Sequence, residues 1–271
     1  MREGVLLQAC GIGYGCSPAD GIMPVFEAEA VVLRHYPLSE YGRIVVFFTR
    51  EYGKLRAAAD GIKKPKSNLA GVLEPFNHVR AAFWFKEGKD LGQVRGAELI
   101  GAFPGKAMDL RRIYTCSYFA ELINEITREN QANHALFRLL AASLKAGTDA
   151  LPTAALVRYF EIWALRLNGF LPNFARCSVC GKNVIDEGFF AWIESGEARC
   201  RACAGGAGLY MGAESVSALE KMMKLPPEGF MINNFEQTAA SELEKFAQRL
   251  LGFNLERQLK SWPLLREALQ S

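Results

Sequence analysis

The stretch IVVFFTREYGKLRAAA, residues 44–59, sets the architecture of the N-terminal part of this chain. Its first six residues are β-branched or aromatic without a polar alternation, which predicts a strand that is buried on both faces. Tyr52, Gly53 and Lys54 then predict a turn, and residues 55–59 predict the strand that follows it. This part of the chain is therefore expected to be β structure.

Three more strands are predicted on either side of this stretch. Residues 26–32 alternate with a period of two, which is typical of a strand with one buried face. Residues 77–85 and 91–99 form two further runs, separated by a polar turn. Five short strands within about 75 residues, with no long helix between them, indicate a small closed barrel.

Beyond residue 103 the hydrophobic period changes from that of strands to that of helices. Asp109 is a predicted N-cap of the first helix, and Pro152 is suited to the first turn of the third. The predicted helices cover residues 109–126, 134–145, 152–169, 214–224 and 238–260. The order along the chain is therefore barrel, helices, a cysteine-rich insert, and helices again.

The insert carries the strongest chemical signal in the sequence. Two Cys-x-x-Cys pairs, Cys177 with Cys180 and Cys200 with Cys203, are separated by nineteen residues. Two intervening residues allow both thiolates of one turn to reach the same metal ion, and two such turns complete a tetrahedron around Zn²⁺. Residues 188–199 are suited to a short hairpin that carries the two turns. The spacing predicts one structural zinc ion, held by all four cysteines.

Other uses of this cysteine pattern fit less well. A redox Cys-x-x-Cys needs no second pair, and a zinc deaminase needs a His-x-Glu motif that none of the three histidines provides. Four thiolates on one dication leave a formal charge of 2 − 4 = −2, which nearby cations are expected to offset: Arg176, Lys182, Arg199 and Arg201. Of the seven cysteines, Cys116 is predicted to lie in a helical core, whereas Cys10 and Cys16 lack metal spacing.

Basic residues are concentrated in the barrel. Between residues 43 and 66 there are seven basic side chains and two acidic ones, although the whole chain has a net charge of only +3. The seven predicted nucleic-acid-binding residues are Arg43, Arg50, Lys54, Arg56, Lys63, Lys64 and Lys66. Phe47, Phe48 and Tyr52 lie among them, and basic grooves with stacking aromatics hold single-stranded nucleic acid. The alternative is that the two phenylalanines belong to the core and that the lysines only solubilise a loop.

Composition and missing motifs exclude several classes of protein. Hydrophobic residues make up 50% and charged residues 23% of the 271 residues, as in ordinary globular proteins, and no apolar run approaches the ~18 residues of a membrane span. His35, His78 and His134 are scattered, and no nucleotide-binding loop or nucleophile motif is present, so no enzyme activity is expected. Residues 1–22 are predicted to be a flexible extension ahead of a second usable start at Met23. A cytoplasmic binding protein is expected.

The order and spacing of several motifs resemble the RecO family of bacterial DNA-repair and recombination-mediator proteins. In the barrel these motifs are AVVLR (30–34), Glu40, FTREYGK (48–54), Gly61, KPKS (64–67) and LEPF (73–76). Further on they are YFAEL (118–122), GFLP (169–172), Cys177-x-x-Cys180-Gly181 and LKS (259–261). One departure is Gly42, at a position where the family often has an acidic residue.

The resemblance implies an α+β multidomain protein. An N-terminal oligonucleotide-binding (OB) fold β-barrel is expected first, followed by an all-α domain with an inserted four-cysteine zinc module. The expected boundaries are residues 1–22 for the extension, 23–104 for the barrel, 105–176 and 208–271 for the two parts of the helical domain, and 177–207 for the zinc module.

The resemblance also implies a function within the RecFOR pathway. It implies binding of single- and double-stranded DNA, annealing of complementary strands and, with RecR, loading of RecA onto DNA coated with single-stranded-DNA-binding protein. The acidic tail of that coating protein is expected to bind in the helical domain, where the candidate cations are Arg158, Arg166, Arg249, Arg257 and Lys260. Two alternatives stay open: a zinc-ribbon and OB protein that acts on RNA in transcription or translation, and an enzyme with a catalytic zinc.

Overall fold

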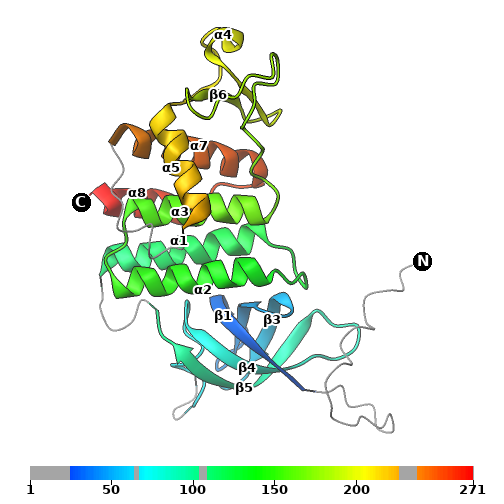
Figure 1. Cartoon of the computed structure of the whole chain (residues 1–271). Helices are drawn as coiled ribbons and strands as arrows, with labels where there is room; N and C mark the ends of the chain where they lie inside the picture. The colour runs from blue at the N-terminus through cyan, green and yellow to red at the C-terminus, as the bar shows by residue number, and fades with distance from the viewer. Residues whose placement is uncertain (1–24, 64–66, 104–108, 226–236, 271) are drawn as a thin grey trace.

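The computed structural model describes residues 25–63, 67–103, 109–225 and 237–270, and Figure 1 shows their arrangement. A β-barrel lies at one end, a stack of helices lies against it, and the cysteine-rich module lies beyond the helices. The order of these parts along the chain is the predicted one. None of the helices in these ranges is both long and apolar enough to cross a lipid bilayer.

Five strands close the barrel. They are β1 (Phe26–Pro37), β2 (Arg43–Thr49), β3 (Gly53–Ala59), β4 (His78–Trp84) and β5 (Leu91–Gly101). Their order around the barrel is β1-β2-β3-β5-β4, and β4 pairs with β1 to complete the circle. The β3–β5 pair is parallel and the other pairs are antiparallel. The predicted five-stranded barrel is thus confirmed, and it has the OB-type architecture.

β1 extends five residues beyond its predicted end at Val32. The register of its pairing with β2 shifts between Val32 and Arg34, which marks a β-bulge. Beyond the bulge Arg34 lies opposite Val46 and Tyr36 lies opposite Ile44, so pairing continues to the end of the strand. The bulge therefore changes which side chains of β1 face outward.

The predicted double burial of residues 44–49 is confirmed for the two phenylalanines. Phe47 belongs to the barrel core together with Phe83, and the two rings meet edge to face at 5.0 Å between centroids. Phe48 belongs to the core of the helical domain, where its ring centroid lies 6.2 Å from that of Phe137. One face of β2 therefore fills the barrel, and the other face joins the barrel to the helices.

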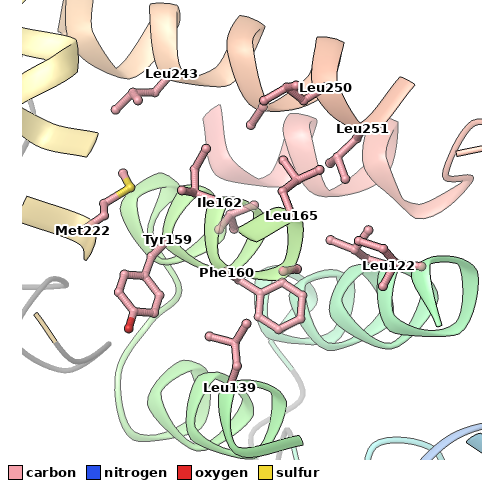
Figure 2. Close-up of a cluster of buried hydrophobic side chains, with 14 of the residues drawn as sticks. Leu122, Leu139, Tyr159, Phe160, Ile162, Leu165, Met222, Leu243, Leu250 and Leu251 are labelled. Atoms are coloured by element: carbon pink, nitrogen blue, oxygen red, sulfur yellow. The ribbon is translucent and has the colours of Figure 1, made fainter. Parts of the chain in front are cut away.

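Six helices of ten or more residues form the helical domain within the described ranges. They are α1 (Leu110–Ile126), α2 (His134–Asp149), α3 (Ala154–Leu167), α5 (Ala213–Lys224), α7 (Gln237–Asn254) and α8 (Ser261–Gln270). Asp109, Asn133 and Thr153 cap the first three, each accepting a hydrogen bond from the N–H three residues further on. Figure 2 shows buried apolar side chains from α1, α2, α3, α5 and α7 in one cluster between the helices.

The predicted helix over residues 238–260 is wrong at its C-terminal end, because α7 ends at Asn254 and α8 begins separately at Ser261. Glu121 of α1 stabilises the start of α8. Its carboxylate accepts hydrogen bonds from the backbone N–H groups of Lys260 (2.9 Å) and Ser261 (2.8 Å) and from the Ser261 hydroxyl. The first N–H groups of a helix have no partner within it, so a carboxylate from another helix supplies one.

The cysteine-rich module contains a small antiparallel sheet. Its elements are β6 (Phe189–Trp192), β7 (Glu197–Arg199), the short helix α4 (Arg201–Ala204) and β8 (Leu209–Met211), with the sheet order β7-β6-β8. The predicted hairpin is confirmed as β6 and β7, whereas β8 was not predicted. Phe189 attaches the sheet to the rest of the protein, since its ring stacks on Phe174 at 5.1 Å and lies edge-on to Phe246 of α7 at 6.4 Å.

Candidate metal centre and nucleic-acid interface

Two turns of the module bring the four predicted metal ligands together. Cys177 and Cys180 lie in the loop before β6, Cys200 is the N-cap residue of α4, and Cys203 lies within α4. Their Sγ atoms all lie within 4.8 Å of one another. These four cysteines are therefore able to hold one metal ion.

Backbone hydrogen bonds hold the first turn in place. The N–H of Gly181 donates to the carbonyl of Cys177 (2.9 Å), and the N–H of Cys177 donates to the carbonyl of Lys182 (2.8 Å). Gly181 has a φ of +73°, in the left-handed region that favours glycine. The N–H of Ser178 donates to the carbonyl of Ala198 at 2.8 Å, which fixes the first turn to β7. The hairpin thus positions both turns.

The chemistry of the four thiols suits Zn²⁺. Backbone N–H groups of Cys200, Cys180 and Val179 lower the pKa of Cys177 to about 6, which favours the thiolate that a metal ion binds. Hydrogen bonds with the other thiols, that of Cys200 first, raise the pKa of Cys203 to about 12. The Sγ atoms of Cys180 and Cys200 are 3.8 Å apart, and a tetrahedron with Zn–S bonds of 2.3 Å has edges of about 3.8 Å. The donor set therefore fits one metal ion, and the Cys180–Cys200 pair has the spacing of a tetrahedral zinc site.

Of the cations expected to offset the thiolate charge, Lys182 is placed to do so. It pairs with Glu187 at 2.8 Å, and its pKa is raised first by Glu187 and further by the negative charge of two of the thiols. Arg199 instead pairs with Glu197 at 3.0 Å, beside the hairpin. Lys182 therefore contributes to charge compensation at the cluster while it keeps a carboxylate partner, and Arg176 lies in the same turn, where its guanidinium is 3.5 Å from the carbonyl oxygen of Gly181.

Lys54, one of the predicted DNA-binding residues, joins the barrel to the helical domain. It is half-buried, and its Nζ donates to the carbonyl oxygens of Asn124 (2.6 Å) and Thr127 (2.7 Å) at the C-terminal end of α1. Burial lowers its pKa. Two predicted neighbours in the basic stretch, Lys64 and Lys66, lie outside the described residues.

The three predicted arginines of the basic stretch are each paired with a carboxylate: Arg43 with Glu74 (3.3 Å), Arg50 with Glu29 (3.0 Å) and Arg56 with Glu129 (2.9 Å). Such partly exposed pairs contribute little to stability, so a phosphate is able to replace the carboxylate at small cost. Lys63 is exposed, and no side-chain partner for it occurs within the described ranges. DNA contacts by these residues stay a prediction.

Phe47 and Phe48 belong to the cores, as the alternative interpretation of the basic stretch predicted, and are not available for stacking. Both side chains are fully buried, one inside the barrel and one beneath the helices. Tyr52 is half-buried and packs on Phe26, with 4.5 Å between ring centroids. Any base that stacks on this barrel must therefore use other aromatic side chains.

A buried polar network between the helices was not predicted. Arg158, which was expected to receive the acidic tail, is only 2% exposed and pairs with Glu161 at 2.8 Å. The hydroxyl of Tyr118 donates to Glu161, and the side-chain amide of Gln248 donates to both groups at 3.0 and 2.8 Å. Burial raises the pKa of Glu161 to about 7. Arg158 is thus excluded as a surface contact, and its spacing of three residues from Glu161 was the one sign of a pair.

Together the fold and the cysteine cluster define a class: proteins with an OB-type barrel, a helical domain packed on it and an inserted four-thiol module that is able to bind a metal. Comparison with known families narrows this class. Residues 23–103 match the family model described as Recombination protein O N terminal, and residues 107–263 match Recombination protein O C terminal. The chain belongs to the RecO family of DNA repair proteins.

Similar curated proteins cover nearly the whole chain. DNA repair protein RecO of Koribacter versatilis (strain Ellin345) is 30% identical over 245 residues, which are 88% of this chain and 97% of the relative. DNA repair protein RecO of Pelotomaculum thermopropionicum (strain DSM 13744 / JCM 10971 / SI) is 31% identical over 247 residues, which are 90% and 94% of the two chains. The similarity therefore includes the barrel, the helices and the cysteine-rich module.

Proposed function

We propose that this protein is a recombination mediator that binds single- and double-stranded DNA and anneals complementary strands. With RecR as its partner, it helps to load RecA onto DNA that is coated with single-stranded-DNA-binding protein. The observation that carries this proposal is the match of both the barrel and the helical domain to the RecO family.

The physics of annealing suits a protein of this kind. Two complementary strands are polyanions that repel each other, and cations on a protein surface reduce this repulsion while they release condensed counterions. Annealing breaks no covalent bond, so the protein needs cations and stacking surfaces rather than a nucleophile. Arg50, Arg56 and Lys63 supply such cations on the barrel, and the first two reach DNA by exchanging a carboxylate for a phosphate.

The resident metal is proposed to be one structural Zn²⁺. Cys177, Cys180, Cys200 and Cys203 would hold it, because their sulfur atoms lie within 4.8 Å of one another and thiolates are preferred zinc ligands. When bound, the ion cross-links the two turns of the module and adds its binding free energy to folding. The β6–β7 hairpin positions the two turns, and the backbone amides that face Cys177 favour its thiolate form.

The acidic tail of the coating protein is proposed to bind exposed cations of the helical domain. Arg249 and Arg257 are 66% and 59% exposed and lie in ion pairs with Glu194 and Glu125. An incoming carboxylate is able to exchange with either partner. Removal of Arg158 leaves four candidates, all of them exposed: Arg166, Arg249, Arg257 and Lys260.

The proposal is tested by the rate at which complementary DNA strands anneal after each has been coated with single-stranded-DNA-binding protein. The full-length protein should accelerate annealing in the absence of any nucleotide, because no step requires hydrolysis. No acceleration on coated strands would contradict the mediator role. Acceleration of complementary RNA strands alone would support the RNA-binding alternative instead.

A further inference from the structure

Two aromatic side chains on the outer face of the barrel belong to neither core. Tyr36, near the end of β1, is 40% exposed, and Trp84, at the end of β4, is half-buried. Neither packs against the barrel core or the helical core. Since Phe83 fills the barrel interior, strand alternation turns the next residue, Trp84, outward. Both rings are therefore available to a ligand.

The strand register connects these two rings across the sheet. Tyr36 of β1 lies opposite Ile44 of β2, and Ile44 lies opposite Ala58 of β3. Ala58 in turn lies opposite Gln93 of β5, and Gln93 lies opposite Trp84 of β4. Directly opposite residues share a face, so these five side chains form one line across β1, β2, β3, β5 and β4, which we call the outer row. Figure 1 shows these strands beneath the helices. Neighbouring strands are ~4.8 Å apart, so the outer row is about 19 Å long.

An arginine lies over each of the two rings. The guanidinium of Arg34 is 4.9 Å from the ring centroid of Tyr36, and that of Arg95 is 5.2 Å from the ring centroid of Trp84. Within the described part of the chain, neither arginine has a carboxylate oxygen within 4 Å. Arg95 is exposed, whereas Arg34 is half-buried and interacts electrostatically with Glu125. Each pair thus presents a flat ring beside a guanidinium, which suits a base and its phosphate.

The helical domain covers one part of the outer face and leaves the two ends of the outer row accessible, whereas Ala58 at its middle is only 7% exposed. Val46 and Phe48, which lie on the same face of β2 as Ile44, are buried in the helical core. In contrast Tyr36, at one end of the outer row, and Leu91, two residues before Gln93, stay 40% and 41% exposed. The accessible parts of the outer row are therefore its two ends, at Tyr36 and at Trp84.

Charges at the two ends of the outer row are mixed. Lys63 is held beside the β1–β2 turn, where its backbone N–H donates to the carbonyl of Tyr41 at 3.2 Å, and Lys86 and Lys89 lie in the β4–β5 turn. Four exposed carboxylates share these two regions: Glu40, Asp60, Glu87 and Asp90. The local excess of positive charge therefore comes from the two arginines that lie over the rings.

We propose that the outer row binds unpaired bases of single-stranded DNA, with one base stacked at Tyr36 and Arg34 and another at Trp84 and Arg95. This inference rests on the proposed function and deepens it, because it names the side chains that hold the strand. Only an unpaired base offers its face to a protein ring, so the outer row selects single strands over duplex. Sites on such barrels start at about 4 nucleotides, a length that a row of about 19 Å accommodates.

The test compares Tyr36→Ala and Trp84→Ala with the wild-type full-length, zinc-loaded protein. Affinities are measured for an oligothymidine of about 20 nucleotides and for a duplex of the same length. Each variant should bind the single strand about five- to a hundredfold more weakly and the duplex within about twofold of wild type, since stacking is lost and phosphate contacts are kept. Tyr210→Ala is the matched control, because that ring is 44% exposed but lies on the cysteine-rich module, and it should bind as wild type does.

Trp84→Phe keeps a stacking ring and separates binding from folding. This variant should retain most of the affinity for single-stranded DNA. Oligothymidine should quench its tryptophan fluorescence less than that of the wild type, because the contribution of Trp84 is missing. Three results would overturn the outer row while the proposed function stands. They are full quenching in Trp84→Phe, wild-type affinity in Tyr36→Ala and Trp84→Ala, and an equal loss of affinity for single strand and duplex. Failure of the wild-type protein to bind single-stranded DNA would overturn both.

Discussion

Replacing Lys54 by methionine should lower the stability of this protein and leave its DNA binding unchanged. Lys54 lies in the basic stretch of the barrel, yet its Nζ donates to two carbonyl oxygens at the C-terminal end of α1, at 2.6 and 2.7 Å. Methionine keeps most of the aliphatic stem of the lysine. The substitution therefore removes the charge and both hydrogen bonds with little change in packing.

The size of the effect follows from these contacts. A hydrogen bond made by a charged group contributes about 1.5–3 kcal/mol, and a cation at a helix C-terminus adds about 0.3–1 kcal/mol. Because Lys54 is half-buried, water replaces part of what is lost, and the expected destabilisation is about 2 kcal/mol. For a protein of this size the Tm should fall by about 4–8 °C.

Lys63→Ala is the matched control, since Lys63 is an exposed lysine of the same stretch. It should leave the Tm unchanged, and loss of one phosphate contact should make the salt dependence of single-strand affinity shallower by about 0.7 in log–log slope. Thermal unfolding and affinity at several salt concentrations are measured for both variants. A Lys54→Met variant with the wild-type Tm and a shallower slope would refute the reasoning, because it would show that Lys54 contacts DNA.

Cys177→Ser should lose the bound metal, measured by elemental analysis, and lower the Tm; retention of both would rule out the four-sulfur site. Lys63→Ala/Lys64→Ala/Lys66→Ala should weaken single-strand binding and make the salt slope shallower by about 2, whereas an unchanged slope would mean that the loop is only solvated. Arg158→Met should cost about 3–5 kcal/mol in unfolding free energy at about pH 8, because it leaves Glu161 buried without its cation. Burial raises the pKa of Glu161 from 4.5 to about 7, so the folded protein binds this proton more tightly than the unfolded chain does. The resulting contribution to folding stability is fully present below pH 4.5 and is lost as the pH rises through 7. The loss in Arg158→Met should therefore be smaller at about pH 5, and denaturant unfolding that gives equal losses at both pH values would contradict this.

Features that depend on neighbouring residues were predictable from the sequence. The spacing of Cys177, Cys180, Cys200 and Cys203 predicted the cluster because a single hairpin carries both turns. The run at residues 44–49 predicted burial on both faces, and its two phenylalanines have it.

Features that depend on distant contacts were not predictable. Lys54 was predicted to contact DNA, because nothing in its local sequence indicates the acceptor on α1, which lies 70 residues further along the chain. The start of α8 was missed for the same reason, since Glu121 lies 139 residues before Lys260. The outward position of Tyr36 could not be predicted because of the bulge in β1. Counted from Phe26 with a period of two it would face the barrel interior, and only the register shift after Val32 turns it outward.

Backbone hydrogen exchange of the full-length, zinc-loaded protein, with and without a saturating single-stranded oligonucleotide, tests most directly whether the barrel holds DNA. We expect slower exchange at the end of β1 and the β1–β2 turn, and in the β4–β5 hairpin near Trp84 and Arg95. Slower exchange confined to the helical domain, or no change at saturation, would contradict the assignment of DNA binding to the barrel.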